Sequence, residues 1–179
     1  MNLHQLQATY QSHEDRILFR ASFKAEDGTL HEVRAALTRR LVKNLWAGLI
    51  EGLETQVALE RPQAAHARAE IVGLQHEACV SAMKEGGNFN NAYESVIEGY
   101  PLGEAAMLIT TADLKIAPGQ PFRINFASVE GKGFEIALTQ PVLHGFCTLL
   151  KETVKNAQWD MTLAMPGMAA PGGVPALLN

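Results

Sequence analysis

ALTRRLV at residues 36–42 returns as ALTQPVL at residues 137–143, a shift of 101 positions along the chain. The pattern that follows keeps the same shift, so that Leu45 corresponds to Phe146. In each copy a threonine precedes apolar residues at helical spacing, and its hydroxyl is suited to accept a hydrogen bond from a free amide of the first turn. The sequence therefore predicts a duplicated unit whose helix begins directly after this threonine.

Apolar and polar residues alternate before each of the two predicted helices, which is the period of a half-buried strand. Turns that accept positive φ interrupt the alternation at Asp27-Gly28 and at residues 130–133. The predicted strands cover about 5–11, 16–24 and 32–37 in the first unit, and 114–116, 122–127 and 134–138 in the second. The predicted fold class is therefore α+β, a tandem pseudo-repeat of an antiparallel meander of three to four strands followed by a helix (βββα-α-βββα).

The segments between and after the units differ in composition. Residues 62–106 form an acidic connector, with a helix after Pro62 and a second short helix capped by Asn91 and Glu94. Residues 162–179 are rich in Pro and Gly, which predicts a mobile tail or a strap held by a partner. The predicted division is thus 1–61, 62–106, 107–161 and 162–179, with both units packed into one compact domain.

Composition limits the possible classes of protein. With 179 residues, 47% of them apolar, the chain has enough material for a sizeable core. We find neither a leader-like segment nor a long apolar run, and the two cysteines are far apart, so we expect a cytoplasmic protein with reduced thiols and no membrane contact. No motif indicates a cofactor. The net charge of −4 arises in residues 63–107, so any surface for nucleic acid has to be a local patch.

Such a patch is present in the first unit. Arg16, Arg20 and Arg34 share the outer face of the predicted sheet, and Arg39 and Arg40 begin its helix. One interpretation is an anion or nucleic-acid site, helped by the free amides at the helix N-terminus. The other is an ordinary solvated strand face, neutralised by nearby glutamates.

Other reactive side chains are placed as helix neighbours. They are His66, Glu70 and Glu77 on one connector face, His76 with Cys79 on another, and His144 with Cys147 in the second helix. The two sets of side chains on the connector helix lie on different faces, so they do not converge as metal ligands would. The pair of His144 and Cys147 lacks a third group that would orient the histidine for catalysis. We therefore interpret the first set as solvated and His76 and Cys147 as core residues, and predict no catalytic or metal site.

Two further segments are candidate binding elements. The glycine- and asparagine-rich loop at residues 86–91 is not preceded by a strand, so we interpret it as a flexible connector rather than a phosphate loop. Met165 and Met168, close to Met161, form a candidate docking surface for a protein partner, because methionine side chains adapt to different surfaces.

The predicted order of two strand-then-helix units resembles the tandem repeats of the Whirly and Pur families in architecture. That resemblance implies binding of single-stranded nucleic acid on a basic, aromatic sheet face, although no sequence motif of either family is present. Our leading hypothesis is a non-enzymatic binding or assembly protein with a protein partner or a second copy of itself. The alternatives are nucleic-acid binding through the five arginines, and a small-molecule-binding protein or enzyme acting in a cleft between the units near His76 or His144.

Overall fold

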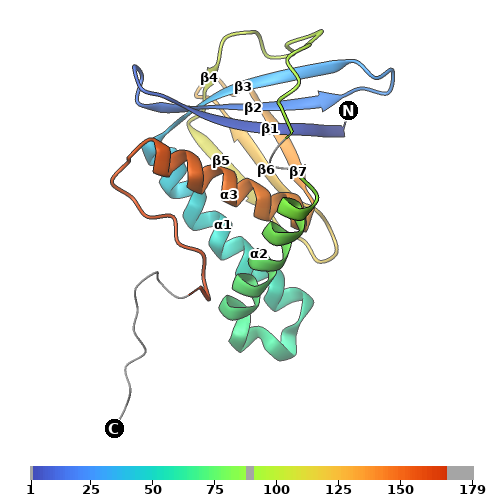
Figure 1. The fold of residues 1–179 in the computed structure, drawn as a ribbon, viewed down its shortest axis with the longest axis vertical. Helices are drawn as coiled ribbons and strands as arrows, with labels where there is room; N and C mark the ends of the chain where they lie inside the picture. The colour runs from blue at the N-terminus through green and yellow to red at the C-terminus, as the bar shows by residue number, and fades with distance from the viewer. Residues whose placement is uncertain (1, 88–90, 169–179) are drawn as a thin grey trace.

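The computed structural model describes residues 2–87 and 91–168 (Figure 1). Within them the fold is mixed α+β, with two sheets and three α-helices. The elements are β1 (Asn2–Gln11), β2 (Arg16–Lys24), β3 (Leu30–Thr38), α1 (Arg39–Glu60), the 3-10 helix η1 (Pro62–Ala67), α2 (Arg68–Glu85), β4 (Met107–Leu108), β5 (Thr111–Lys115), β6 (Phe122–Ala127), β7 (Gly133–Leu138) and α3 (Gln140–Asn156). The predicted α+β class is confirmed.

The first sheet has the strand order β1-β2-β3-β4. Its first three strands are antiparallel neighbours, and β4 pairs with β3 in parallel. Alternation buries the inner side chains Ile17, Phe19 and Ala21 of β2 completely. The outer face carries the polar side chains of the same strands, among them Arg16 and Arg20. This face holds most of the predicted arginine patch.

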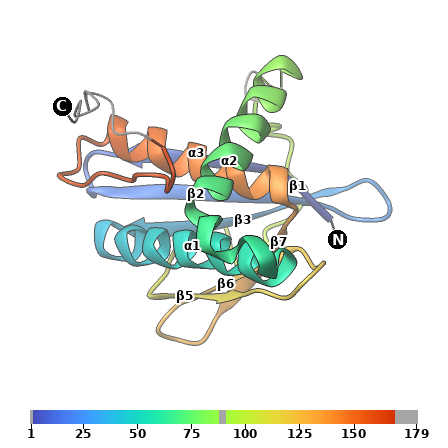
Figure 2. The ribbon, with the colours of Figure 1, turned by 90° about the horizontal axis from the view of Figure 1, so that it is seen from below.

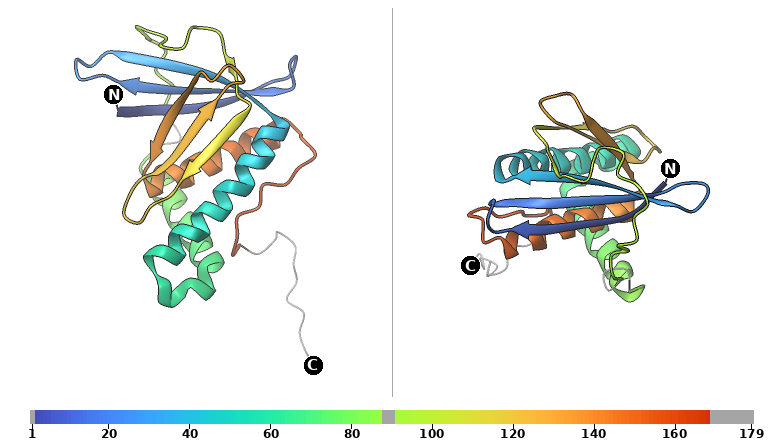
Figure 3. Two further views of the ribbon diagram at one scale, coloured as in Figure 1. Left: turned by 180° about the vertical axis from the view of Figure 1, so that it is seen from behind. Right: turned by 90° about the horizontal axis from the view of Figure 1, so that it is seen from above.

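The second sheet has the order β5-β6-β7, and its strands cross those of the first sheet, as the view from behind shows (Figure 3). The chain passes from one sheet to the other directly, because Ile109 and Thr110 alone separate β4 from β5. The inner faces meet in one apolar cluster, in which the Phe19 ring lies 5.8 Å from that of Phe126 and 5.6 Å from that of Phe146.

The helices begin where the repeated threonines predict. The Thr38 hydroxyl accepts a hydrogen bond from the Leu41 amide at 3.2 Å, and helix α1 follows. Before α3, the Thr139 side chain makes no capping bond, and its carbonyl accepts from the Leu143 amide at 2.8 Å. Helices α1 and α3 each pack against the sheets, and α2 crosses and contacts both of them (Figure 2). No helix in the described ranges is both long and apolar enough to span a bilayer.

Two predicted segments differ from the structure. The sequence predicts a short helix capped by Asn91 at residues 91–100, but this segment is not helical and its one regular feature is an isolated bridge between Gly99 and His31. Residues 162–168 pack against the molecule instead of forming a tail: Leu163 is buried, and the Trp46 indole N–H donates to the Ala164 carbonyl at 3.2 Å. Both differences arise because long-range contacts outweigh local composition. The remainder of the predicted tail, 169–179, lies outside the described residues.

Candidate functional site: a covered basic face and an apolar groove

Residues 91–106, called the strap below, cross the outer face of the first sheet. At β1 the strap is held by Gln5, whose side chain donates to the Ala92 carbonyl at 3.1 Å and accepts from the Glu94 amide at 2.9 Å. At β3 it runs along the strand edge, where the Glu32 amide donates to the Gly99 carbonyl at 2.9 Å. The strap, which is the last part of the acidic connector, therefore lies on the basic face.

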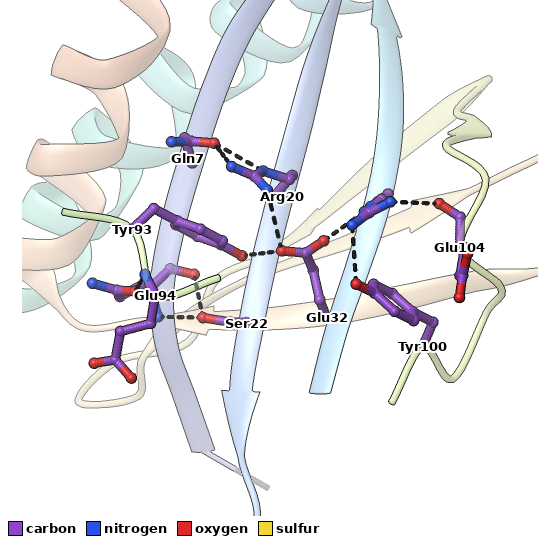
Figure 4. Close-up of polar contacts among 10 residues, drawn as sticks. Gln7, Arg20, Ser22, Glu32, Tyr93, Glu94, Tyr100 and Glu104 are labelled. Atoms are coloured by element: carbon purple, nitrogen blue, oxygen red, sulfur yellow. Dashed lines mark hydrogen bonds and ion pairs between the residues drawn. The ribbon is translucent and has the colours of Figure 1, made fainter. Parts of the chain in front are cut away.

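Glu32 is the centre of this contact, and its side chain is completely buried. Its carboxylate accepts from the Arg34 guanidinium at 2.5 Å and from the Tyr93 hydroxyl at 2.7 Å, and it lies 3.7 Å from the Arg20 guanidinium (Figure 4). The strap tyrosines also cover the arginines, with Arg20 over the Tyr93 ring and Arg34 over the Tyr100 ring. One buried carboxylate thus joins Arg20 and Arg34 to the strap.

The pairing register explains why this carboxylate is needed. Arg20 lies directly opposite Arg34 on neighbouring strands, and like charges in that position destabilise a sheet. The hydrogen bond to Glu32 raises the pKa of Arg34 above its ordinary value. Burial, followed by the bond to Glu32, raises the pKa of Tyr93, so its hydroxyl stays protonated and continues to donate. Arg20 and Arg34 therefore anchor the strap in this conformation.

The other three predicted arginines lie at the opposite end of the sheet. Arg16 pairs with Glu14 at 2.6 Å, and Arg39 lies 3.5 Å from the Asp15 carboxylate and over the Trp159 ring. Asp15 also accepts from the Trp159 indole at 2.6 Å and the Tyr10 hydroxyl at 2.9 Å, and these bonds lower its pKa. The structure therefore divides the predicted patch into two separate groups.

Arg39 and Arg40 border a hollow at the N-terminus of α1. It is lined by Arg39, Arg40, Lys43, Asn44, Asp160 and Met161. Three cationic side chains and the first amides of a helix make this a region of positive potential, which Asp160 partly offsets. This group is the part of the predicted patch that the strap leaves uncovered.

His76 and His144 form a buried pair between α2 and α3. Their Nδ1 atoms are 3.2 Å apart, His144 is completely buried, and His76 is 6% exposed. Burial, and then the neighbouring His76, lower the pKa of His144 to about 4. Burial, and then Lys151, also lower the pKa of His76. Both rings are therefore neutral at pH 7, and neither lines the hollow at α1 or the groove described next.

A groove of about 460 Å³ lies between β1 and the first half of α3. Among the residues that the structure describes, its walls are mainly apolar and include no Asp, Glu, Lys or Arg. The lining residues are Leu3, His4, Gln5, Leu6, Gln7, Met83, Asn91, Tyr93, Val142, Gly145, Phe146 and Leu149. In its wall, the Met83 side chain of α2 lies against Gly145 of α3.

The groove lies along the outer edge of β1, which is the first strand of its sheet. The Thr153 hydroxyl of α3 donates to the Leu149 carbonyl at 2.7 Å and lies 3.4 Å from the Ala8 carbonyl. The Ala8 carbonyl therefore faces α3 and points away from β2. Backbone groups alternate in direction along an antiparallel strand, so the N–H and C=O of Leu6 also point away from β2, toward the groove. The groove therefore combines apolar walls with backbone groups that an added strand would bind.

The remaining candidate residues are separated from one another. His66, Glu70 and Glu77 are exposed on η1 and α2, and within the described ranges no three His, Cys, Asp or Glu side chains gather as metal ligands would. Burial raises the pKa of both Cys79 and Cys147. Residues 88–90 of the proposed loop lie outside the described residues.

The two candidate docking methionines have different surroundings. Met165 is 4% exposed and belongs to the apolar core, whereas Met168 is 38% exposed. Met165 therefore contributes to packing in this structure, and only Met168 remains on the surface.

Sequence reasoning missed the strap and the groove. The strap had one signal, since Glu32 stands on the same predicted strand face as Arg34 and the connector is the acidic part of the chain. The groove had none, because β1, α2 and α3 meet there from distant parts of the sequence. Comparison of the chain with models of known protein families, with curated proteins and with solved structures found no match.

Proposed function

We propose that the protein is a non-enzymatic binding or assembly protein that receives an extended, uncharged, apolar segment of a protein partner in the groove beside β1. The segment would add to the free edge of the first sheet and insert alternate side chains between β1 and α3. Strand addition of this kind takes its affinity from main-chain hydrogen bonds and its specificity from side-chain pockets.

The observation that carries this proposal is the position of the groove. The groove has mainly apolar walls, and it borders a strand edge whose Leu6 backbone groups point into it. Edges of this kind are normally blocked or paired, because unpaired backbone groups attract other chains. The strap closes the β3 edge in that way, whereas the part of β1 beside the groove has no pairing strand in the described residues.

Val142 offers a direct test, because it lines the groove from the first turn of α3 and is partly exposed. A glutamate is favourable in a first helical turn, so Val142→Glu should fold while placing a charge in the apolar wall. Random peptides displayed on phage and selected on the full chain should show apolar residues at alternate positions. Their affinity for V142E should fall at least about tenfold, a loss of about 1.4 kcal/mol.

The matched control is Val129→Glu, at an 87% exposed position in the β6–β7 turn. Selected peptides should bind this variant as they bind the unmodified chain. Selection that enriches no extended apolar pattern, or peptides that bind V142E unchanged, would remove the proposal.

The hollow at α1 favours a second candidate, binding of single-stranded nucleic acid or another polyanion. Fewer arginines support this candidate than the sequence predicted, since Arg20 and Arg34 are bound by Glu32 and the strap. The tandem repeat and the Whirly-like architecture belong to this second proposal, and they rest on the repeated sequence pattern and the order of elements.

Replacing Arg39 and Arg40 with alanine tests this candidate. Binding of a fluorescent single-stranded oligonucleotide should weaken with rising salt, and the double variant should lower both the affinity and the salt slope, by about 1 for each phosphate that is no longer bound. The control is Arg123→Ala on the second sheet, where the arginine is paired with Glu135. Binding that is absent or independent of salt would exclude this candidate.

We do not propose that the protein is an enzyme acting in a cleft between the two units. That hypothesis required a pocket with convergent polar groups near His76 or His144, and the two rings face each other in a packed interior.

A further inference from the structure

We propose that the groove beside β1 is occupied by the chain's own residues 174–178, which have the sequence VPALL and act as an intramolecular competitor of the partner segment. This inference rests on the proposed function, because it assigns an occupant to the same groove. Three observations support it: the segment matches the groove in polarity, its proline is compatible with an added edge strand, and the chain is long enough to reach the groove.

The chemical match is in charge and polarity. The described part of the groove lining contains no Asp, Glu, Lys or Arg, and the sequence of residues 169–179 contains none either. Apolar side chains at 174 and 176–178 suit the walls made by leucine, valine and phenylalanine, because removing such side chains from water is favourable.

The position of Pro175 is compatible with an added edge strand. A proline lacks an N–H, so it must lie where the backbone group faces away from the neighbouring strand. With Pro175 facing outward, alternation directs the backbone groups of Val174, Ala176 and Leu178 toward β1. This arrangement loses no hydrogen bond to β1.

The chain also has sufficient length. Gly167 lies against the backbone of Ala69 and Glu70, at the start of α2, and Met83 at the end of that helix touches Gly145 beside the groove. The backbone of Pro166 and Gly167 also lies against Gly73 of this helix. The helix rises 1.5 Å per residue, so Gly73 and Met83 are about 15 Å apart. An extended chain covers about 20 Å between Met168 and Val174, which is enough to bring residues 174–178 to the groove of the same molecule.

The test measures amide hydrogen exchange of Leu6 by NMR in the full chain. Three proteins are compared: the unmodified chain, the double variant L177D/L178D, and the control double variant A169D/A170D in the same segment. An occupied edge should protect the Leu6 amide, and L177D/L178D should make its exchange at least about tenfold faster, while A169D/A170D should leave it unchanged. Equal exchange rates in all three proteins would overturn the proposal.

Two further readouts separate the outcomes. If protection falls on dilution and light scattering shows dimers, the occupant is the segment of a second copy, and the intramolecular assignment is wrong. If exchange is the same in all three proteins while selected peptides still bind and lose affinity for V142E, residues 174–178 are not the occupant and the proposed function stands. If selection also fails, the groove is not a binding site for extended segments.

Discussion

Replacing Glu32 with alanine is expected to lower the free energy of unfolding by about 3 kcal/mol, because it leaves two arginines without their shared carboxylate. The side chain is completely buried, whereas those of Arg20 and Arg34 are 24% and 28% exposed. Water can therefore compensate part of the loss at the arginines, which places the effect near the low end of that for a broken buried pair. Denaturation with urea at pH 7 measures it.

Glu135 provides the matched control. It also stands on a strand between two cations, Arg123 at 2.8 Å and Lys115 at 3.4 Å, but its side chain is 33% exposed. Exposed pairs of this kind contribute about 0–1 kcal/mol, so Glu135→Ala should have a much smaller effect. Equal losses in E32A and E135A would contradict the assignment of Glu32 as a buried centre.

Loss of Glu32 should also release the strap, because Tyr93 and Tyr100 are held through this cluster. Chymotrypsin cuts after tyrosine, so limited proteolysis of E32A should cleave the strap faster than it cleaves the unmodified chain. Glu32→Gln separates charge from shape: it keeps an oxygen to accept from Tyr93 and should destabilise less than alanine. Cleavage of the strap at equal rates in E32A and E135A would show that the strap is held by other contacts.

The α+β class was predictable because its signals are local. Alternation and the threonine cap depend on neighbouring residues, and they predicted the meanders and the start of α1. The segment after Asn91 shows the limit of such signals. Its cap-like pattern favoured a helix, but Tyr93 gains a hydrogen bond and a cation–π contact on the sheet only in an extended chain. Tertiary contacts of this size outweigh helix propensity.

The arginine patch was predictable in position but not in its contacts. Alternation correctly assigned Arg20 and Arg34 to the outer face, yet nothing local indicates that the acidic connector returns to cover them. The groove could be predicted even less well from the sequence, because its walls form only when α3 packs against β1. Sequence periodicity specifies which face of an element is apolar, and it does not specify which other element that face meets.

Acidification is expected to destabilise the protein through the histidine pair. The pKa of His144 is about 4 in the folded chain, against an ordinary value of 6.5 for this group. Between these values the unfolded chain takes up a proton that the folded chain does not, so stability is full above pH 6.5 and falls as the pH approaches 4. This difference corresponds to about 3 kcal/mol from His144, and the lowered pKa of His76 acts in the same direction.

The measurement is the urea unfolding free energy between pH 7 and pH 4 for the unmodified chain, His144→Leu and the double variant H76L/H144L. Carboxylates add their own acid dependence to all three, so the informative quantity is the difference between proteins. His144→Leu should lose about 3 kcal/mol less over this range than the unmodified chain does, and the double variant should lose less still, because it also removes His76. At pH 7 the double variant should be close to the unmodified chain in stability, because it removes both members of the pair, along with the His144 Nε2 that has no partner in the described residues.

His13 provides the control, because it lies exposed in the turn between β1 and β2. His13→Ala should keep the full acid dependence of the unmodified chain. If H144L retains that dependence as well, the buried pair does not take part in acid unfolding. If H144L alone is much less stable than the double variant at pH 7, the remaining His76 is the source, since its Nδ1 then lies in the core without the ring that it contacts.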